Sequence, residues 1–448
     1  MAVALIILAA GKGTRMNSEN PKVLHPIAGA PMLVHAMNAG ATLDPEHTVI
    51  VAGHGADAVT KAATAHDDTA KVVLQTEQLG TGHAVLQAKD SLTGFDGKAI
   101  VLYGDTPFVQ PETLQAMLDA EADVVVLGFE PADAGRYGRL VMDGTSLERI
   151  VEYKDASPIE RSLKLCNSGV ICAPAPLLFD LLDQTGNDNA SGEYYLTDVI
   201  GLARRSGHSA TVVTCDEAET LGVNSRAELA AADALFQTRK RVELMEDGVT
   251  LVAPETVYFA LDTIIGRDTL IEPNVVFGPG VTVESGATIR AFSHLEGCHV
   301  ARGGIIGPYA RLRPGTELSE DVRIGNFVEI KNAQIAEGAK VNHLSYIGDA
   351  GVGAKSNIGA GTITCNYDGV MKHYTDIGSN VFIGSNTMLV APVSIGDGAM
   401  TGSGSVITSD VESNALALSR APQVEKPGMA RKLFDMLKAK KARQSRGS

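Results

Sequence analysis

Leu8-Ala9-Ala10-Gly11-Lys12-Gly13-Thr14-Arg15-Met16 is the stretch that decides the fold of the first half of the chain, and Pro21-Lys22 follows it closely. The apolar run before it, residues 3–8, predicts a buried first strand. The glycines let backbone N–H groups approach phosphate oxygens, because no Cβ atom stands between them. Three cations, Lys12, Arg15 and Lys22, accompany the loop. The stretch therefore predicts a phosphate-binding loop or a plain strand-to-helix turn, and it fits neither the P-loop nor the dinucleotide pattern.

Composition limits the classes of protein to which the chain can belong. Its 448 residues suffice for two or more domains. The net charge of −15 argues against a nucleic-acid partner, although a few local cations and a bound metal still allow phosphate binding. The five scattered cysteines predict free thiols in a reducing compartment. No run is long enough to span a membrane, and the start lacks the features of a signal peptide, so we expect a cytoplasmic protein without a membrane partner.

Strand-like and helix-like segments alternate over residues 1–226, which predicts an α/β domain with a doubly wound sheet. Four continuous β-branched runs are typical of buried parallel strands: residues 49–51, 72–74, 100–102 and 124–127. Ligands of such sheets bind beyond the carboxyl ends of the strands, where the opening loop and Tyr103-Gly104-Asp105 both fall. Asp105 is placed to ligate Mg²⁺ together with substrate phosphates, although a turn aspartate before Pro107 is the plainer alternative.

The full string from Leu8 to Lys22 resembles the signature of the sugar-phosphate nucleotidyltransferases, which join a nucleoside triphosphate to a sugar 1-phosphate. The resemblance implies that Arg15 and Lys22 act in catalysis and that Asp105 and Asn224 bind Mg²⁺. It also implies a nucleotide- and sugar-binding set in family order: Leu8, Ala9, Ala10, Gly11, Lys22, Gln75, Gly80, Thr81, Tyr103, Gly104, Gly138, Glu152, Asn167 and Asn224. Within that set, Gln75 and the turn at Gly80 match elements that recognise uracil. Each residue alone has an ordinary structural explanation. The evidence for the resemblance is that they all occur together and in the family's order.

A change of pattern divides the chain. Residues 227–247 are helix-friendly and lack glycine and proline, so they predict a linker helix of the kind that joins two domains, or else the last helix of the first domain. Over residues 248–425, apolar side chains recur every six positions, as at Ile265, Ile271, Phe277 and Val283. A six-residue period with small turn residues indicates a parallel β-helix and excludes an amphipathic helix. Residues 426–448 form a basic, helix-prone tail that we expect to be a solvated end.

Two departures from the six-residue rhythm predict a function for this second half. His343 stands beside the hexads in Asn342-His343-Leu344-Ser345, and the period lapses from Asn366 until Ile377. The lapse predicts a loop that leaves the coil, and loops on rigid scaffolds commonly carry function. A histidine suits a general base that takes a proton from an attacking amine, although a structural histidine is the commoner case.

These strings resemble the acetyltransferase half of the bacterial bifunctional uridylyltransferase/acetyltransferases that make UDP-N-acetylglucosamine, and the resemblance spans nearly the whole chain. It implies a left-handed β-helix in which His343 is the general base. The implied sugar-phosphate-binding residues are Arg313, Lys331, Tyr346 and Asn357. The implied acetyl-CoA-binding residues are Ala360, Asn366, Tyr367, Ser385, Ser403 and Arg420. The resemblance further implies a homotrimer that binds acetyl-CoA, a co-substrate, between its subunits.

The expectation is a cytoplasmic, Mg²⁺-dependent enzyme with two active sites. The second domain would acetylate glucosamine 1-phosphate, and the first would join the product to UTP and release pyrophosphate. One alternative is a single-activity nucleotidyltransferase with a structural β-helix, which has no need for His343 or the loop at Asn366. Another is a non-catalytic sensor of nucleotide sugars, which would not need to retain the metal and phosphate ligands Arg15, Lys22, Asp105 and Asn224.

Overall fold

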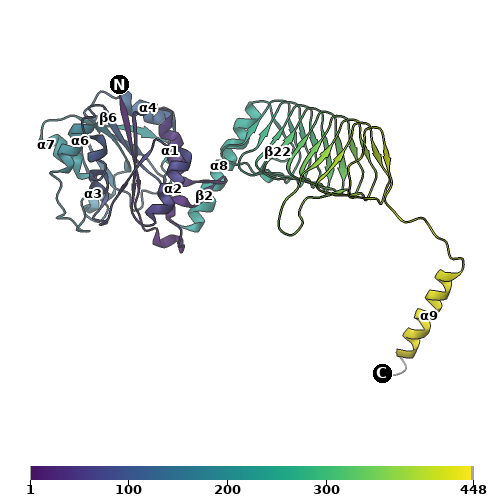
Figure 1. Ribbon diagram of the computed structural model, residues 1–448. Helices are drawn as coiled ribbons and strands as arrows, with labels where there is room; N and C mark the ends of the chain where they lie inside the picture. The colour runs from purple at the N-terminus through teal and green to yellow at the C-terminus, as the bar shows by residue number, and fades with distance from the viewer. Residues whose placement is uncertain (1, 445–448) are drawn as a thin grey trace. The chain divides into compact units, whose positions relative to one another are not determined.

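A computed structural model describes residues 2–444, and the chain divides into two compact units (Figure 1). The first unit extends to Glu246 and includes Tyr258–Thr263, and the second begins at Asp247 and resumes at Ile264. The helix predicted between two domains is α8, Arg226–Glu246, and it belongs to the first unit. The end of the predicted basic tail, residues 445–448, lies outside the described residues. Over residues 2–444, no helix is both long and apolar enough to cross a membrane.

A mixed sheet forms the core of the first unit. β1, Val3–Ala9, is buried along its whole length and pairs in parallel with β4, His47–Ala52, and with β6, Lys98–Tyr103. The strand order is β11-β7-β10-β6-β1-β4-β5. The remaining members are β5 (Lys71–Leu74), β7 (Val124–Phe129), β10 (Cys166–Pro174) and β11 (Ala210–Cys215), and the hairpin β8 (Arg139–Asp143) and β9 (Ser146–Val151) extends from β10.

The sheet differs from the predicted one in two strands. Residues 72–74, predicted as a buried strand, lie in β5 at the edge of the sheet and are partly exposed. β10 was not predicted, and it runs antiparallel to both β6 and β7. Helices cover the sheet: α1 (Met32–Ala41), α2 (Ala56–His66), α3 (Thr81–Leu86), α4 (Pro111–Asp119), α6 (Ala175–Leu182) and α7 (Asp198–Arg205), with a short α5 (Pro158–Arg161) near β8. A small hairpin of β2 (Pro26–Ile27) and β3 (Ala30–Pro31) contacts α8.

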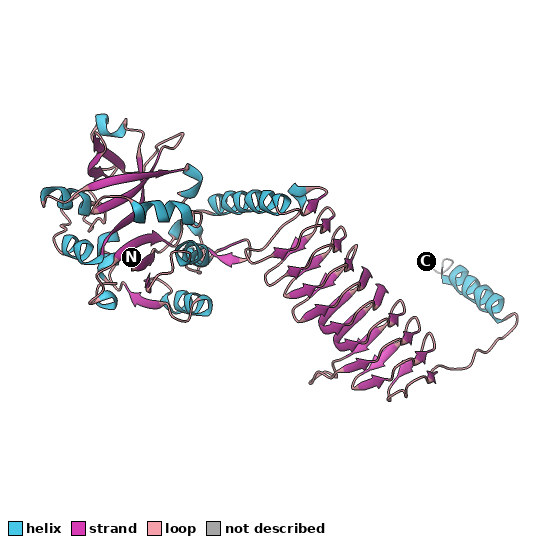
Figure 2. Cartoon of the chain, turned by 90° about the horizontal axis from the view of Figure 1, so that it is seen from above, coloured by secondary structure: helices cyan, strands magenta, loops and turns pink. Residues whose placement is uncertain are grey.

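The second unit is the predicted β-helix, a left-handed coil of short parallel strands (Figure 2). Its strands stack in three columns. Column one holds β12 (Thr250–Leu251), β14 (Leu270–Ile271), β17 (Thr288–Ile289), β20 (Ile305–Ile306), β23 (Arg323–Asn326), β25 (Lys340–His343), β27 (Asn357–Ile358), β30 (Phe382–Ile383), β33 (Met400–Thr401) and β35 (Leu416–Ala417). Column two holds β15 (Val276–Phe277), β18 (His294–Leu295), β21 (Arg311–Leu312), the first halves of β24 (Glu329–Ile335) and β26 (Tyr346–Val352), β28 (Ile363–Cys365), β31 (Met388–Val390) and β34 (Val406–Ile407). Column three holds β13 (Ile264–Ile265), β16 (Thr282–Val283), β19 (Cys298–Val300), β22 (Thr316–Leu318), the second halves of β24 and β26, β29 (Thr375–Ile377) and β32 (Val393–Ile395).

The six-residue period is the packing rule of this coil. In most two-residue strands an apolar side chain points inward and is buried, as at Ile271, Ile289 and Ile306, while its neighbour is more exposed. The corners are tight: a Cβ atom added at Gly325 would lie 1.9 Å from the carbonyl oxygen of Asn342 in the next coil. The predicted loop leaves the coil between β28 and β29. The tail forms α9, Met429–Gln444, which is exposed along its length.

Candidate active sites

The first candidate site is a cavity of about 340 Å³ at the carboxyl ends of β1 and β6. The opening loop forms one wall, and the segment after β5 forms another. Ten predicted residues line it: Leu8, Ala9, Ala10, Gly11, Lys22, Gln75, Gly80, Thr81, Tyr103 and Asp105. Glu193 also lines it, and three further lining residues were not predicted: Val23, Gln78 and Ala84. Gln78 closes part of the wall because its amide Nε2 donates to the Ala10 carbonyl at 2.7 Å.

A cation-binding arrangement lies at the end of β6. The Lys22 ammonium donates to the Asp105 carboxylate and, at 2.9 Å, to Oδ1 of Asn224, which precedes α8. The two oxygens can therefore face one cation. Carboxylate and amide oxygens are hard ligands, and Mg²⁺ commonly takes only one or two of them beside phosphate oxygens and waters. Over residues 2–444 no group of three or more His, Cys, Asp or Glu could hold a metal ion.

Gln75 is buried at one end of the cavity and is fixed by its neighbours. Its Nε2 donates to the Gly80 carbonyl at 3.0 Å and lies 3.1 Å from Nδ1 of His83. The side-chain carbonyl therefore remains as an acceptor at the cavity wall. Gly80 has a φ of +115°, and a Cβ atom there would lie 2.6 Å from the Tyr194 carbonyl oxygen, so only glycine fits this turn.

The neighbouring cavity, of about 510 Å³, contains Glu152 and is lined also by Arg136, Tyr153, Lys154, Ser191 and Tyr195. Burial raises the pKa of Glu152, and the Thr197 hydroxyl that donates to it at 3.3 Å offsets only part of this effect. Gly138 leaves room beside the carboxylate, since an added Cβ atom would lie 3.4 Å from Glu152 Oε1. Burial, reinforced by the nearby carboxylates of Glu152 and Asp105, also raises the pKa of Tyr103, which stays a neutral phenol between the two cavities.

The remaining predicted residues lie outside both cavities. Arg15 is exposed on a short turn after the glycine loop. The Gly104 N–H donates to the Leu8 carbonyl at 2.9 Å, and this hydrogen bond holds the start of the glycine loop against the end of β6. Asn167 accepts the Gly169 N–H at 3.0 Å and donates its own N–H to the Gly138 carbonyl at 2.9 Å. Asn167 therefore shapes the turn that carries Gly138.

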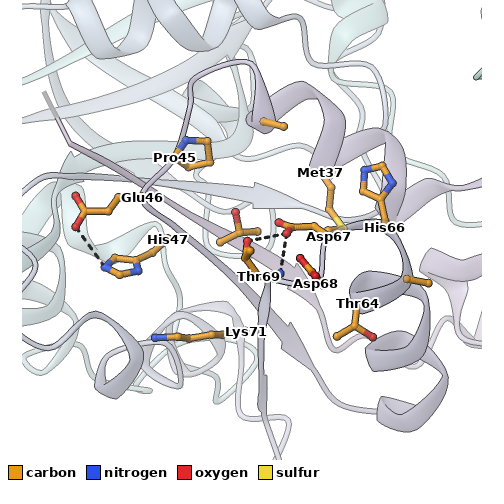
Figure 3. A pocket seen from close by; sticks show the side chains of 13 residues that line it. Met37, Pro45, Glu46, His47, Thr64, His66, Asp67, Asp68, Thr69 and Lys71 are labelled. Carbon is orange, nitrogen blue, oxygen red and sulfur yellow. Dashed lines mark hydrogen bonds and ion pairs between the residues drawn. The ribbon is translucent and has the colours of Figure 1, made fainter.

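A further cavity, of about 580 Å³, contains none of the predicted site residues (Figure 3). It lies where β4 and β5 begin, at the opposite ends of these strands from the glycine loop, and His47, His66 and Lys71 are among its lining residues. In Figure 3 the close contacts are local ones, between His47 and Glu46 and between Asp67 and Thr69.

Five predicted residues lie at one corner of the β-helix, between columns one and two: His343, Ala360, Ser385, Ser403 and Arg420. We call it the His343 corner. The carbonyls of Asn326, His343, Ala360 and Ser385 each accept an N–H from the following coil at 2.7–3.2 Å, so these residues stack in successive coils. Ser403 occupies the same place one coil later, where its carbonyl accepts from the Arg420 guanidinium at 2.7 Å. Asn357 lies in column one, directly before this corner.

The His343 imidazole is exposed and oriented by one neighbour. Its Nδ1 lies 2.9 Å from Oδ1 of Asn326, which pairs with it across β23 and β25. With the proton on Nδ1, that nitrogen donates to Asn326 and Nε2 keeps a free lone pair, as a general base requires. Asn326 was not predicted.

The corner between columns two and three carries four further predicted residues: Arg313, Lys331, Asn366 and Tyr367. We call it the Asp349 corner. Arg313 and Lys331 follow β-pairs of column two in successive coils, and Arg313 donates to Glu329 at 2.8 Å. Asn366 and Tyr367 begin the loop, which folds back through an antiparallel bridge between Tyr367 and Lys372. The sequence-predicted set is thus divided between two corners of the same coil, with Tyr346 on the strand between them.

Comparison with known proteins covers the whole chain. Residues 5–176 match the family model of MobA-like NTP transferase domains, and residues 262–297 and 374–409 match that of bacterial transferase hexapeptides. The chain is 71% identical over 450 residues to the bifunctional protein GlmU of Roseobacter denitrificans and 68% identical to that of a Ruegeria species, with 100% of both chains covered in each case. It is 70% identical to the bifunctional protein GlmU of Ruegeria pomeroyi, with 99% of each chain covered.

Proposed function

Because the chain belongs to the bifunctional GlmU family, we propose that its two units catalyse successive steps in the synthesis of UDP-N-acetylglucosamine. The second unit transfers acetyl from acetyl-CoA to glucosamine 1-phosphate, and the first transfers uridylyl from UTP to the product. The relatives are bifunctional over the full length that this chain matches, which argues against a single-activity enzyme with a structural β-helix. A sensor without activity is disfavoured by the retained cation-binding pair of Asp105 and Asn224.

The stack at the His343 corner is the observation that carries the acetyltransferase assignment. The coils repeat at the spacing of hydrogen-bonded strands, so His343 to Ser403 spans about 14 Å, enough to follow an extended pantetheine arm. His343 takes a proton from the sugar amine, whose nitrogen forms a bond to the thioester carbonyl carbon. The carbon–sulfur bond then breaks, and the thiol of CoA leaves with a proton. Ser385 and nearby backbone N–H groups would stabilise the oxyanion.

The first unit's cavity suits uridylyl transfer. A uracil imide N–H needs an acceptor, which the fixed Gln75 side chain offers. The phosphate oxygen of N-acetylglucosamine 1-phosphate attacks the α-phosphorus of UTP, and the bond to pyrophosphate breaks. Alignment and charge neutralisation dominate such reactions, and Lys22 at the cavity wall with Arg15 beside the glycine loop supply the cations.

Mg²⁺ fits the pair of oxygens that now hold the Lys22 ammonium. Asp105 and Asn224 would hold the metal, which would neutralise charge on the triphosphate when bound. Lys22 would then be released toward the substrate phosphates. The observation in support is the convergence of both oxygens on one cation.

The division of the acetyltransferase residues between two corners supports a homotrimer. The base and the phosphate-binding cations of one chain lie at opposite ends of column two, so a site made between two chains brings one corner of each together. A coil of three columns offers flat faces that can pack around a threefold axis. Light scattering on the intact protein tests this: we expect three chains per particle, and a fully active monomer would contradict it.

Substrate dependence of the two half-reactions tests the proposed function. Acetyl transfer should need only glucosamine 1-phosphate and acetyl-CoA, whereas uridylyl transfer should need UTP, Mg²⁺ and the acetylated sugar. Product identification by mass spectrometry separates the two. Loss of the acetyl step alone would favour the single-activity alternative.

A further inference from the structure

One buried carboxylate lies at the centre of the Asp349 corner and has no part in the mechanism above. Asp349 is 7% exposed and sits in the left-handed region at φ +48°. Its Oδ1 accepts from Nδ2 of Asn332 at 2.6 Å, and its Oδ2 accepts from Nδ2 of Asn366. Both oxygens are therefore committed to protein donors, one in the preceding coil and one at the root of the loop. A buried charge is costly unless it is hydrogen-bonded, and Asn332 and Asn366 provide these hydrogen bonds to Asp349.

Two lysines converge on the same place. Lys331 lies beside Gly348 in the register of β24 and β26, directly before Asn332. Lys372 returns to the coil because its backbone pairs with Tyr367. The contact with Lys372 lowers the pKa of Lys331, and burial and Arg313 lower it further, while Asp349 opposes this and raises it. Burial raises the pKa of Asp349, but the hydrogen bonds from Asn332 and Asn366, with the two lysines nearby, outweigh it and leave the pKa lowered.

We propose that Asp349 is a positioning residue of the acetyltransferase site, which holds Asn366 at the root of the loop, beside the lysines that receive the sugar phosphate. The inference rests on the proposed function. Two adjacent ammonium groups repel each other and would tend to lose a proton, yet a phosphate dianion is bound best when both are charged. The negative charge of Asp349 opposes this loss, because it raises the pKa of Lys331. The same carboxylate anchors Asn366, and so it couples the loop to the phosphate site.

The charge balance at this corner gives the inference a signature that a structural role lacks. The groups that face Lys331 are Lys372, Arg313 and Asp349, and Arg313 is itself paired with Glu329. Replacing Asp349 by asparagine removes the one group that raises the pKa of Lys331. Lys331 then loses its proton at lower pH, and the KM for glucosamine 1-phosphate begins to rise at lower pH than in the wild type.

The experiment compares acetyl transfer by the wild type, Asp349→Asn and the control Asp397→Asn across the alkaline pH range. Asp397 is also a corner carboxylate, but it accepts from the Ser379 N–H, in a coil corner away from the Asp349 corner. For Asp349→Asn we expect a loss of about tenfold to a hundredfold in kcat/KM for glucosamine 1-phosphate, which is the scale of one charge-assisted hydrogen bond. We also expect the alkaline limb of the profile of kcat/KM against pH to move to lower pH. Uridylyl transfer and the control should be unchanged.

A second variant keeps the inference testable if Asp349→Asn does not fold. Lys372→Met leaves Asp349 in place and removes the group that most lowers the pKa of Lys331, so the alkaline limb should move to higher pH. A folded Asp349→Asn protein with unchanged KM and unchanged pH profile, or a Lys372→Met protein whose limb does not move, would overturn the proposal. An inactive wild type would instead overturn the proposed function.

Discussion

Asn326→Ala tests whether the orientation of His343 contributes to acetyl transfer. The substitution removes the acceptor 2.9 Å from Nδ1 and leaves the imidazole itself in place. A hydrogen bond between neutral groups contributes about 0.5–1.5 kcal/mol, which corresponds to roughly a twofold to tenfold fall in rate. Loss of the base itself, in His343→Ala, costs about a hundredfold to ten-thousandfold. The two variants should therefore differ clearly in size of effect.

The assay is release of the CoA thiol at saturating glucosamine 1-phosphate, with uridylyl transfer measured on the same preparations. We expect Asn326→Ala to lower kcat by roughly twofold to tenfold and to leave uridylyl transfer intact. In the double variant with His343→Ala, the loss should equal that of His343→Ala alone, because the amide acts only through the imidazole. Gln334→Ala, an exposed amide on β24, is the control. Losses that add in the double variant would refute the reasoning.

The remaining predictions concern the first unit and the coil. Asp105→Ala should abolish uridylyl transfer and spare acetyl transfer, and EDTA should do the same to the wild type; inhibition of both steps in a folded protein would contradict a single metal site. Gly325→Ala should destabilise the coil by about 1–3 kcal/mol, because its Cβ would meet a backbone oxygen at 1.9 Å, whereas Gly11→Ala, with nothing within 4 Å, should leave the Tm unchanged. Glu152→Gln should raise the Tm at pH 8, since the raised pKa means that stability from Glu152 falls as pH rises through the unfolded and then the folded pKa, and the gain should shrink in acid.

Much of the fold could be predicted because local pattern and packing agree. The six-residue period names the buried residue of nearly every short strand, as Ile271 and Ile289 show. The loop after β28 is visible as a lapse in that period. The antiparallel course of β10 could not be predicted, because pairing direction depends on connections far along the chain rather than on composition.

The partners of the site residues were missed although the sequence carries a signal for them. One coil of this helix takes 17 residues here, so Asn326 and His343 are separated by 17, as are Asn332 and Asp349, and Asp349 and Asn366. Polar residues at one-coil spacing in an apolar repeat mark a stacked ladder. In the first unit no such period exists, and the meeting of Lys22 with Asn224, 202 positions apart, follows only from the tertiary fold.

The most direct test of two activities on one chain is a substrate-omission assay on the intact protein. With glucosamine 1-phosphate, acetyl-CoA, UTP and Mg²⁺ present, the product should be UDP-N-acetylglucosamine. Without UTP the reaction should stop at N-acetylglucosamine 1-phosphate, and without acetyl-CoA no nucleotide sugar should form. A nucleotide sugar made from glucosamine 1-phosphate without acetyl-CoA, or no acetylated sugar under any condition, would contradict the account.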